Sequence, residues 1–329
     1  MLKTLLKTFL LLLVLLSSFL ATALPAGAQE EADEPDGPAH LVVGTLGGVQ
    51  FWTDELIFHD WRIQRHAWTN HCRLLDGKNI RRGWGDFDDC YAALEAYKRE
   101  CDPPRMTGKV VLLLHGLCRS RASMEATARY LAEHSDYRVI PLSYASTRAE
   151  VADHALALAS VVRHLEDVEE IHFVAHSLGN LVVRHYFGDR AAAGDPVDPR
   201  IKRVVMLSPP NNGSRLAEVF ENNPIFRVVW GRSGIEIADW KALEQHLATP
   251  PCEFGIVAGG VRSLDNPLVK GDDDGVVSVL ETRLPGAADF LVVPSIHGNI
   301  MANKQACEAT LQFLRNGCFV TPEARQPIH

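Results

Sequence analysis

From residue 109 onward, the chain alternates between short apolar runs and longer stretches with helical periodicity. Short apolar runs bounded by turn-forming residues are typical of buried strands, whereas apolar positions recurring every three or four residues predict amphipathic helices. The predicted strands are 110–114, 139–142, 171–175, 204–207, 254–257 and 290–293, and the predicted helices are 123–134, 148–165, 178–187 and 303–314. Thr147, with Glu150 three residues later, predicts a capping box at the second helix. This alternation predicts an α/β fold with a mostly parallel central sheet flanked by helices.

Residues 40–105 have a different pattern, in which short strand-like runs are separated by Gly and Asp turns. These runs are 41–43, 55–58 and 61–68, and a short helix is predicted at 91–99. Four of the six tryptophans lie in this part of the chain: Trp52, Trp61, Trp68 and Trp84. We interpret it as a small β-rich extension that packs on a main domain at 106–320, with binding of a substrate or a surface as the alternative.

The N-terminus has the pattern of an export signal. Lys3 and Lys7 precede a strongly apolar run, and Ala26-Gly27-Ala28 offers a small-residue cleavage site. We therefore expect residues 1–28 to be a signal peptide and the protein to be periplasmic or secreted. The apolar stretch 9–24 is shorter than the ~20 residues of a membrane span, so an uncleaved N-terminal anchor is the alternative. Residues 29–39 are acidic and almost devoid of bulky apolar groups, which predicts a disordered linker.

The net charge and the cysteine spacing bear on whether the protein binds nucleic acid or metal ions. Removal of residues 1–28 takes the formal charge from −8 to −10, and no basic cluster remains to suggest a nucleic-acid partner. No zinc-type spacing appears, and no metal or other cofactor is predicted. In an oxidising compartment we expect disulfides within each of two cysteine trios, with Cys118 as a free thiol. The trios are Cys72, Cys90 and Cys101, and Cys252, Cys307 and Cys318.

Ser177 is a candidate nucleophile, because it lies where a predicted strand meets a predicted helix. A serine on such a sharp turn needs small residues two positions before and two positions after it. Ala175 and Gly179 occupy these positions. The turn would hold the serine Oγ at the carboxyl edge of the sheet, and the helix behind it would direct free N–H groups at a developing oxyanion.

A nucleophilic serine needs a base and an acid that orients the base, and later loops supply both in the chain order Ser, Asp, His. His297 follows the last predicted strand, and an Asp cluster follows the strand 254–257. We choose Asp274 as the acid because Gly275 after it permits a tight turn. Asp272 and Asp273 would then be solvated neighbours, or a weak calcium site as the alternative.

Two backbone N–H groups are candidate oxyanion donors: that of Leu178, after the nucleophile, and that of Leu117, after the first strand of the predicted sheet. His115 is expected to make a structural hydrogen bond within the turn rather than to transfer a proton. Cys118 is expected to serve in packing, although it is the first thiol to test for inhibitor sensitivity.

These motifs, together with the loop 209–214, resemble the α/β-hydrolase superfamily. Within it they are most similar to bacterial lipases and to the lipase-like serine esterases related to the GPI inositol-deacylase group. The resemblance covers residues 108–316, and the separation of twenty-three residues between Asp274 and His297 is similar to that of the family. Ala175 replaces the usual first glycine of the elbow, as in some small bacterial lipases. The β-rich extension has no counterpart that we can match.

The resemblance implies an α/β-hydrolase fold and hydrolysis of a carboxylic ester, as in a lipase or carboxylesterase. Ser177 would attack, His297 would carry the proton, Asp274 would orient His297, and the amides of Leu117 and Leu178 would hold the oxyanion. The expected partner is an ester or lipid substrate, with peripheral contact to a lipid surface as a further candidate.

Two other functions remain open. One is an acyltransferase, amidase or thioesterase on the same triad, and the other is a non-catalytic envelope-binding protein that kept the fold. Residues 215–248 are apolar enough to form a cap or lid over an acyl-chain groove, or they form two ordinary helices packed on the sheet.

Overall fold

The computed structural model describes residues 48–215, 217, 224–261 and 271–329. The predicted signal peptide, the predicted linker and the predicted strand at 41–43 lie outside the described residues. Among the residues described, every helix is too short or too polar to cross a lipid bilayer.

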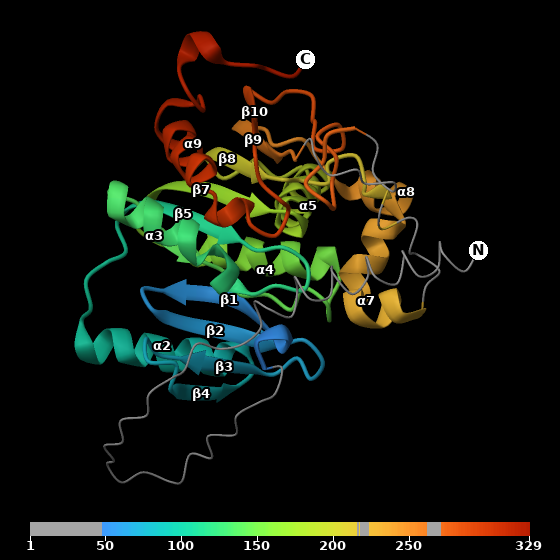
Figure 1. The fold of residues 1–329 in the computed structure, drawn as a ribbon. Helices are drawn as coiled ribbons and strands as arrows, with labels where there is room; N and C mark the ends of the chain where they lie inside the picture. Colours follow the sequence, from blue (N-terminus) through green and yellow to red (C-terminus); the bar gives the residue numbers. More distant parts are fainter. Residues whose placement is uncertain (1–47, 216, 218–223, 262–270) are drawn as a thin grey trace, which may run out of the picture. The chain divides into compact units, whose positions relative to one another are not determined.

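A six-stranded parallel sheet organises the main body of the protein (Figure 1), in the order β10-β9-β8-β7-β5-β6. Strand β7 is almost entirely buried, because helices cover both of its faces. The strands are β5 (Gly108–Leu114), β6 (Arg138–Pro141), β7 (Val168–His176), β8 (Ile201–Leu207), β9 (Glu253–Gly259) and β10 (Asp289–Val293). The predicted fold class is confirmed.

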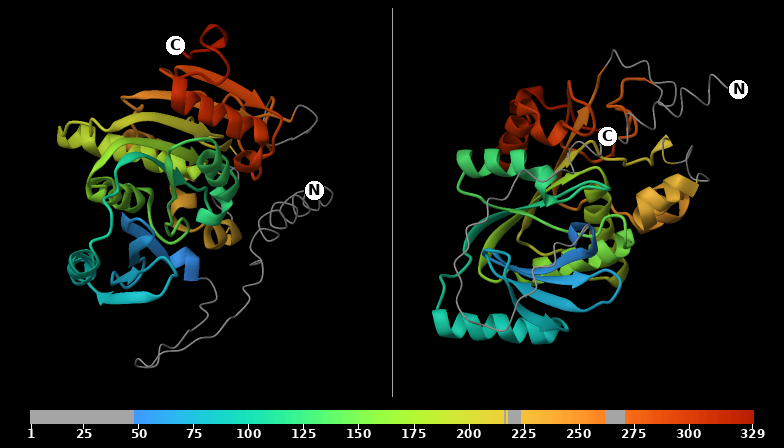
Figure 2. Two further views of the ribbon diagram at one scale, coloured as in Figure 1. Left: turned by 90° about the vertical axis from the view of Figure 1, so that its left-hand side faces the viewer. Right: turned by 60° about the horizontal axis from the view of Figure 1, so that its bottom comes forward.

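Helices cover both faces of this sheet (Figure 2). On one face α4 packs against α5, and on the other α3 packs against α9. A hydrophobic core cluster lies on the second face, where Leu131 of α3 and Phe313 of α9 meet Leu113 and Val174 of the sheet. The helices are α3 (Glu125–His134), α4 (Val151–His164), α5 (Leu178–Ala193) and α9 (Lys304–Asn316), and between β8 and β9 the chain forms α7 (Pro224–Ala238), α8 (Trp240–Leu243) and η3 (Glu244–His246).

The β-rich extension is a four-stranded antiparallel sheet covered on one face by α2 (Phe87–Cys101). Its strands are β1 (Trp52–Phe58), β2 (Trp61–His66), β3 (Cys72–Leu75) and β4 (Arg81–Gly85), preceded by η1 (Gly48–Phe51). Its small core includes Ile63, Leu74 and Leu94. Asp86 and Asp89 form a reciprocal capping box at the start of α2.

Asp54 joins this extension to the main body. The carboxylate is buried and accepts hydrogen bonds from Arg62, Gln64 and the Ser143 N–H at 2.6, 2.7 and 2.7 Å. The Asp54 N–H also donates to the Ser143 carbonyl at 2.9 Å. Because a buried carboxylate is costly unless its oxygens are satisfied, this network fixes β1 beside the segment that follows β6.

The predicted capping box at Thr147 is wrong. Helix α4 begins at Val151, and Glu150 is its N-cap, with Asp153 as the reciprocal partner. Thr147 lies in the preceding turn, where its hydroxyl donates toward Gln50 and its carbonyl accepts from the Arg232 N–H. These contacts with distant segments place Thr147 outside the helix.

The predicted disulfides are also absent, because all seven cysteines, each within the described ranges, are free thiols. Cys72 and Cys90 pack in the small core of the extension, whereas Cys101 is exposed at the end of α2. The buried Cys307 thiol donates to the Met301 carbonyl at 3.5 Å. The buried thiols of Cys72, Cys90 and Cys307 therefore serve as small apolar groups in the packing.

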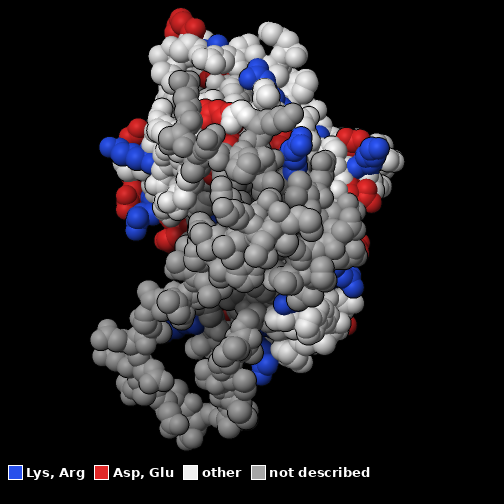
Figure 3. Space-filling view, turned by 45° about the vertical axis from the view of Figure 1, so that its right-hand side comes forward, with Lys and Arg blue, Asp and Glu red and all other residues white. Residues whose placement is uncertain are grey.

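Charged side chains of both signs lie interspersed on the described part of the face seen in Figure 3. The ion pairs between neighbouring elements include Arg203 with Glu253 at 2.7 Å and Lys109 with Glu170 at 3.6 Å. Exposed pairs of this kind each contribute about 0–1 kcal/mol, so burial of the apolar core dominates the stability of the fold.

Candidate active site

Ser177 lies at the junction between β7 and α5, with a strained backbone (φ 51°, ψ −120°). A positive φ is uncommon for a residue with a Cβ and costs of order 1–3 kcal/mol. The Ser177 N–H donates to the Leu207 carbonyl at 3.0 Å, and its own carbonyl accepts from the Asn180 N–H at 3.0 Å. Packing of both neighbouring elements therefore holds the strained turn in place.

Close packing around the turn explains its small residues. A Cβ on Gly179 would lie 2.8 Å from both Cβ and the carbonyl oxygen of Leu114. A Cβ on Gly116 would lie 2.8 Å from His176 Nδ1 and 3.2 Å from Ser177 Cβ. The loop after β5 can approach Ser177 only because glycine occupies both positions.

His297 is brought to Ser177 from the loop after β10. Its Nε2 is 2.9 Å from Ser177 Oγ, and its Nδ1 is 2.8 Å from Asp274 Oδ2. Only 7 % of His297 and 1 % of Asp274 is exposed. With Nδ1–H donated to the carboxylate, Nε2 is left to accept the Ser177 proton.

Asp274 is held by its own loop. Its Oδ1 accepts from the N–H groups of Val276 and Val277 at 3.0 and 2.8 Å, which leaves Oδ2 directed at His297. Gly275 has φ 96°, so the tight turn after Asp274 does require a glycine. The site thus brings together the serine, histidine and carboxylate predicted from the sequence.

The solvated role predicted for Asp273 is wrong, because this residue is 1 % exposed. Its Oδ1 accepts from the Gly275 N–H at 2.6 Å, so it helps to close the loop behind Asp274. Asp272 is half-buried. Within the described residues, no three His, Cys, Asp or Glu side chains are grouped as a metal site would need, so the calcium alternative finds no support there.

The two predicted oxyanion donors, Leu117 and Leu178, directly follow Gly116 and Ser177 in the chain. Leu178 is the first residue of α5, and the first N–H groups of a helix have no acceptor within the helix. Leu117 follows Gly116 in the turn after β5, and a Cβ on Gly116 would lie 3.2 Å from Ser177 Cβ. His115 makes the expected hydrogen bond within that turn, from Nδ1 to the Gly116 carbonyl at 2.8 Å.

Buried imidazoles lie beneath the site. His176 Nε2 donates to the His297 carbonyl at 3.0 Å, which fixes the backbone of the histidine beside Ser177. Burial, and next the neighbouring His297, holds the pKa of His176 well below its usual range. Burial likewise lowers the pKa of His115 to about 4. Both rings are therefore neutral near pH 7, which suits support by hydrogen bonding rather than proton transfer.

Sequence reasoning missed Arg119, which lies beside Gly298, and Gln50, which holds the Arg119 backbone. Arg119 follows Leu117 by two residues, and its Nη2 lies 2.7 Å from where a Gly298 Cβ would be. Its carbonyl accepts from Gln50 Nε2 at 2.7 Å. No local sequence pattern marks a contact between residues so far apart in the chain.

The predicted cap region, 215–248, lies partly outside the described residues. In the described part, α7 is kinked at Gly231 (φ 63°), where a Cβ would collide with the Thr147 carbonyl. Beyond the kink, the Ser233 hydroxyl donates to the Ala149 carbonyl at 2.9 Å. Glu236 Oε2 accepts from the Val151 N–H at 2.8 Å. The second half of α7 is therefore anchored at the start of α4.

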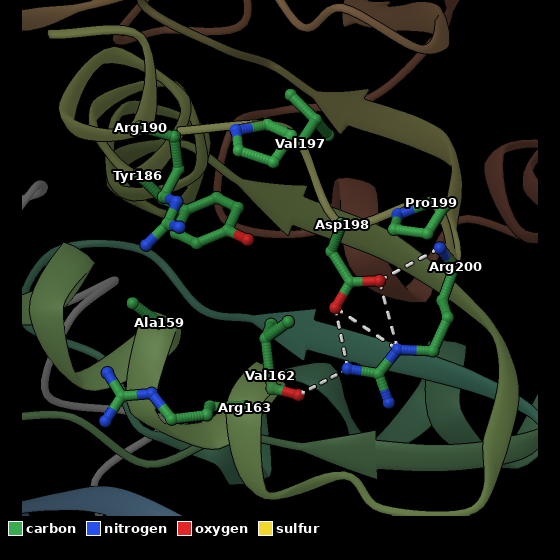
Figure 4. Close-up of a pocket in the computed structure, with 10 residues that line it drawn as sticks. Ala159, Val162, Arg163, Tyr186, Arg190, Val197, Asp198, Pro199 and Arg200 are labelled. Atoms are coloured by element: carbon green, nitrogen blue, oxygen red, sulfur yellow. Dashed lines mark hydrogen bonds and ion pairs between the residues drawn. The ribbon is translucent and has the colours of Figure 1, made fainter. Parts of the chain in front are cut away.

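A cavity of about 770 Å³ lies elsewhere, between α4, α5 and the segment before β8 (Figure 4). The Arg200 guanidinium in its wall bonds to Asp198 and to the carbonyls of Val162 and Leu165 at the end of α4. Arg190 pairs with Asp195 at 2.8 Å. Because both arginines are paired with carboxylates, and Arg200 also caps the end of α4, we assign them a structural role.

Residues 84–230 match a family model described as a domain of unknown function, DUF7379. No curated protein matches the sequence.

Several solved structures are similar to parts of the chain. Lipase BlEst2 of Bacillus licheniformis in its mature form has 17% identity and a TM-score of 0.46, with 65% of this chain and 94% of that chain covered. Phospholipase PlaB of Legionella pneumophila has 17% identity and a TM-score of 0.49, with 65% of this chain and 60% of that chain covered. The metagenomic carboxyl esterase MGS0156 has 19% identity and a TM-score of 0.45, with 60% of this chain and 68% of that chain covered.

The assignment of the fold rests on features of the chain itself. Its strands are parallel and its helices cover both faces of the sheet. A strained serine lies between a strand and a helix, and the acid and the histidine follow in that chain order. The chain has the α/β-hydrolase fold.

Proposed function

We propose that this protein is a serine hydrolase that cleaves carboxylic esters through an acyl-enzyme on Ser177. The observation that carries the proposal is the continuous chain of short contacts from Ser177 Oγ through His297 to Asp274, at 2.9 and 2.8 Å. Nucleophile, base and orienting acid within hydrogen-bond reach are what acyl transfer requires.

The first half-reaction transfers the acyl group to the enzyme. Ser177 Oγ attacks the ester carbonyl carbon as His297 Nε2 takes the hydroxyl proton. The buried Asp274 carboxylate stabilises the imidazolium formed and keeps Nδ1 protonated. The N–H groups of Leu117 and Leu178 are the proposed donors to the oxyanion, and loss of one such donor typically costs about 3 kcal/mol.

Collapse of the tetrahedral intermediate breaks the bond to the alcohol, which leaves with the proton from His297. Water then enters, gives a proton to His297 Nε2 and attacks the acyl-enzyme. The second collapse releases the carboxylic acid and returns the proton to Ser177. The neutral, buried His176 supports this cycle by holding the His297 carbonyl.

We further propose that the protein acts after export, on the basis of the N-terminal sequence pattern, and that its substrates are esters or lipids. A cap formed by 215–248 and contact with a lipid surface are parts of the same proposal. Secretion of the full chain and the mass of the mature protein test the proposal of export.

The experiment that tests the activity is hydrolysis of p-nitrophenyl esters of short and long acyl chains by wild type and Ser177→Ala. A fluorophosphonate probe should label the wild type and not the variant. Activity that disappears in Ser177→Ala together with labelling would support the proposal. Equal rates in the two proteins, or labelling that persists in the variant, would contradict it.

A further inference from the structure

The segment that follows β6 is held by the β-rich extension. In Figure 1, β1 is the strand of the extension beside α4, and it bonds to this segment at two residues. The Ser143 N–H and carbonyl bond to Asp54 of β1 at 2.7 and 2.9 Å. The Ala145 N–H donates to Thr53 Oγ1 at 3.1 Å. The backbone on both sides of Tyr144 is therefore fixed by the extension.

The Tyr144 side chain contacts the turn after β5. Its hydroxyl donates to the His115 carbonyl, and its ring stacks on the His115 ring, with 4.0 Å between the ring centres and 6° between the planes. Only 4 % of Tyr144 is exposed, and burial raises the pKa of its hydroxyl well above the usual value, so the hydroxyl keeps its proton and acts as a donor. Tyr144 therefore holds both the backbone and the ring of His115.

His115 in turn holds the peptide group that links Gly116 to Leu117. Its Nδ1 is bonded to the Gly116 carbonyl at 2.8 Å, and the Arg119 N–H donates to the same oxygen at 3.3 Å. The Gly116 carbonyl and the Leu117 N–H belong to one planar peptide group, so holding the oxygen sets the direction of the N–H. A Cβ on Gly116 would lie only 3.2 Å from Ser177 Cβ, so the turn lies against the nucleophile.

We propose that Tyr144 is a positioning residue for ester hydrolysis: it links the β-rich extension, through His115, to the peptide group that carries the Leu117 N–H. Tyr144 needs no contact with the substrate in this role, because oxyanion stabilisation is effective when its donors are oriented in advance. This inference rests on the proposed esterase function and deepens it, since it gives the extension a part in stabilising the transition state.

Tyr144→Phe tests the link, because it keeps the ring stacked on His115 and removes only the hydroxyl. Tyr137→Phe is the matched control, because the buried Tyr137 hydroxyl also donates to a backbone carbonyl, that of Leu314 in α9, at 3.2 Å. On a soluble p-nitrophenyl ester we expect kcat of Tyr144→Phe to fall by about tenfold with KM within about twofold of wild type. This is less than the factor of about 10²–10³ that loss of a whole oxyanion donor costs. The control should keep both constants, although it loses a comparable hydrogen bond.

An inhibitor that forms an oxyanion separates positioning from a loss of stability. An alkyl trifluoromethyl ketone reacts when Ser177 Oγ adds to its carbonyl carbon, the hydroxyl proton passes to His297, and the ketone oxygen becomes an oxyanion. Because that oxygen needs the same N–H donors as the ester intermediate, the inhibition constant should rise about tenfold in Tyr144→Phe, in step with the fall in kcat. It should be unchanged in Tyr137→Phe.

Thr53→Val tests the connection to the extension. It removes the acceptor of the Ala145 N–H and keeps the shape of the side chain, and we expect kcat to fall by about threefold. Because Thr53 acts on the turn through the segment that carries Tyr144, the double variant with Tyr144→Phe should lose about tenfold rather than the product of about thirtyfold. A multiplicative loss would contradict a route through Tyr144. If Tyr144→Phe does not fold, Thr53→Val applies the kcat and inhibitor tests to the same segment.

Amide hydrogen exchange of residues 115–119 gives a readout independent of hydrolysis. It should be faster in Tyr144→Phe than in the wild type and unchanged in Tyr137→Phe. Wild-type kcat in both variants of an active enzyme would overturn the positioning role and leave the esterase proposal intact. Faster exchange in Tyr144→Phe, in a protein that hydrolyses no ester, would support the hold of Tyr144 on the turn and contradict the esterase proposal. Unchanged exchange without hydrolysis would contradict both.

Discussion

Asp274 and His297 are joined twice. The side chains meet through Nδ1 and Oδ2 at 2.8 Å, and the His297 backbone N–H donates to the Asp274 carbonyl at 2.9 Å. The backbone bond fixes the distance between the two loops, and the side-chain bond fixes the rotation of the imidazole. A substitution that removes only the charge of the carboxylate should therefore leave the loops in place.

Asp274→Asn is the substitution that tests this arrangement. We expect kcat on p-nitrophenyl esters to fall by about 10³–10⁴, because an amide favours the wrong imidazole tautomer and does not stabilise the imidazolium. The Asn Oδ1 can still accept from Val276 and Val277, so the thermal unfolding temperature should change little. Asp272→Asn, in the same loop, is the control and should keep activity within about tenfold of wild type. Equal losses in both variants would contradict the assignment of Asp274.

Ser177→Gly and Ser177→Ala separate backbone strain from chemistry. Both variants lack the hydroxyl and should be inactive. Only glycine, which has no Cβ, adopts a φ of 51° without steric strain. We expect the glycine variant to exceed the alanine variant in free energy of unfolding by about 1 kcal/mol. Denaturant titration of the two proteins measures the difference. A glycine variant less stable than the alanine variant would show that the turn stores no strain.

The sequence predicted the structure best where a segment is buried and its pattern of apolar residues reflects that burial. Each predicted strand of the main sheet overlaps a strand of the structure, and only Leu142 extends beyond one, because buried parallel strands consist of continuous apolar runs. The serine, histidine and acid could be chosen in advance because this fold places them after particular strands. Their catalytic roles remain predictions.

Features set by contacts between distant segments could not be predicted. Thr147 has the local pattern of a helix cap, but its bonds to Gln50 and Arg232 draw it into a turn. Asp273 is next to the chosen acid in a polar stretch, yet the fold of the loop buries it. Spacing along the chain also says nothing about which cysteines approach one another.

Gln50 links the β-rich extension to the loop that follows β5. Its amide holds the Arg119 carbonyl, and this loop also carries Leu117, the proposed oxyanion donor. For Gln50→Ala we expect kcat on a neutral ester to fall by about tenfold with little change in KM, because the donor acts mainly in the transition state. Gln245→Ala, at an exposed position in η3, is the control. A rise in KM at unchanged kcat would argue instead for a role in substrate binding.

Glu236 makes the anchoring of α7 dependent on pH. Its carboxylate caps the start of α4 through Val151, and burial, with Glu150 and Asp153 nearby, raises its pKa to about 7. Because the folded protein holds this proton more tightly than the unfolded chain, the contribution of Glu236 to stability is complete below pH 4.5 and is lost as the pH rises through 7.

Glu236→Gln removes the charge but keeps an oxygen that can accept from Val151. We expect the variant to be more stable than wild type by about 2 kcal/mol at pH 8.5, since solvent screens part of the full effect, and to match it at pH 4. Thermal unfolding of both proteins across this range, with Glu323→Gln at an exposed position as the control, measures the difference. A stability gain independent of pH would mean that packing, and not the carboxylate charge, limits the contact between α7 and α4.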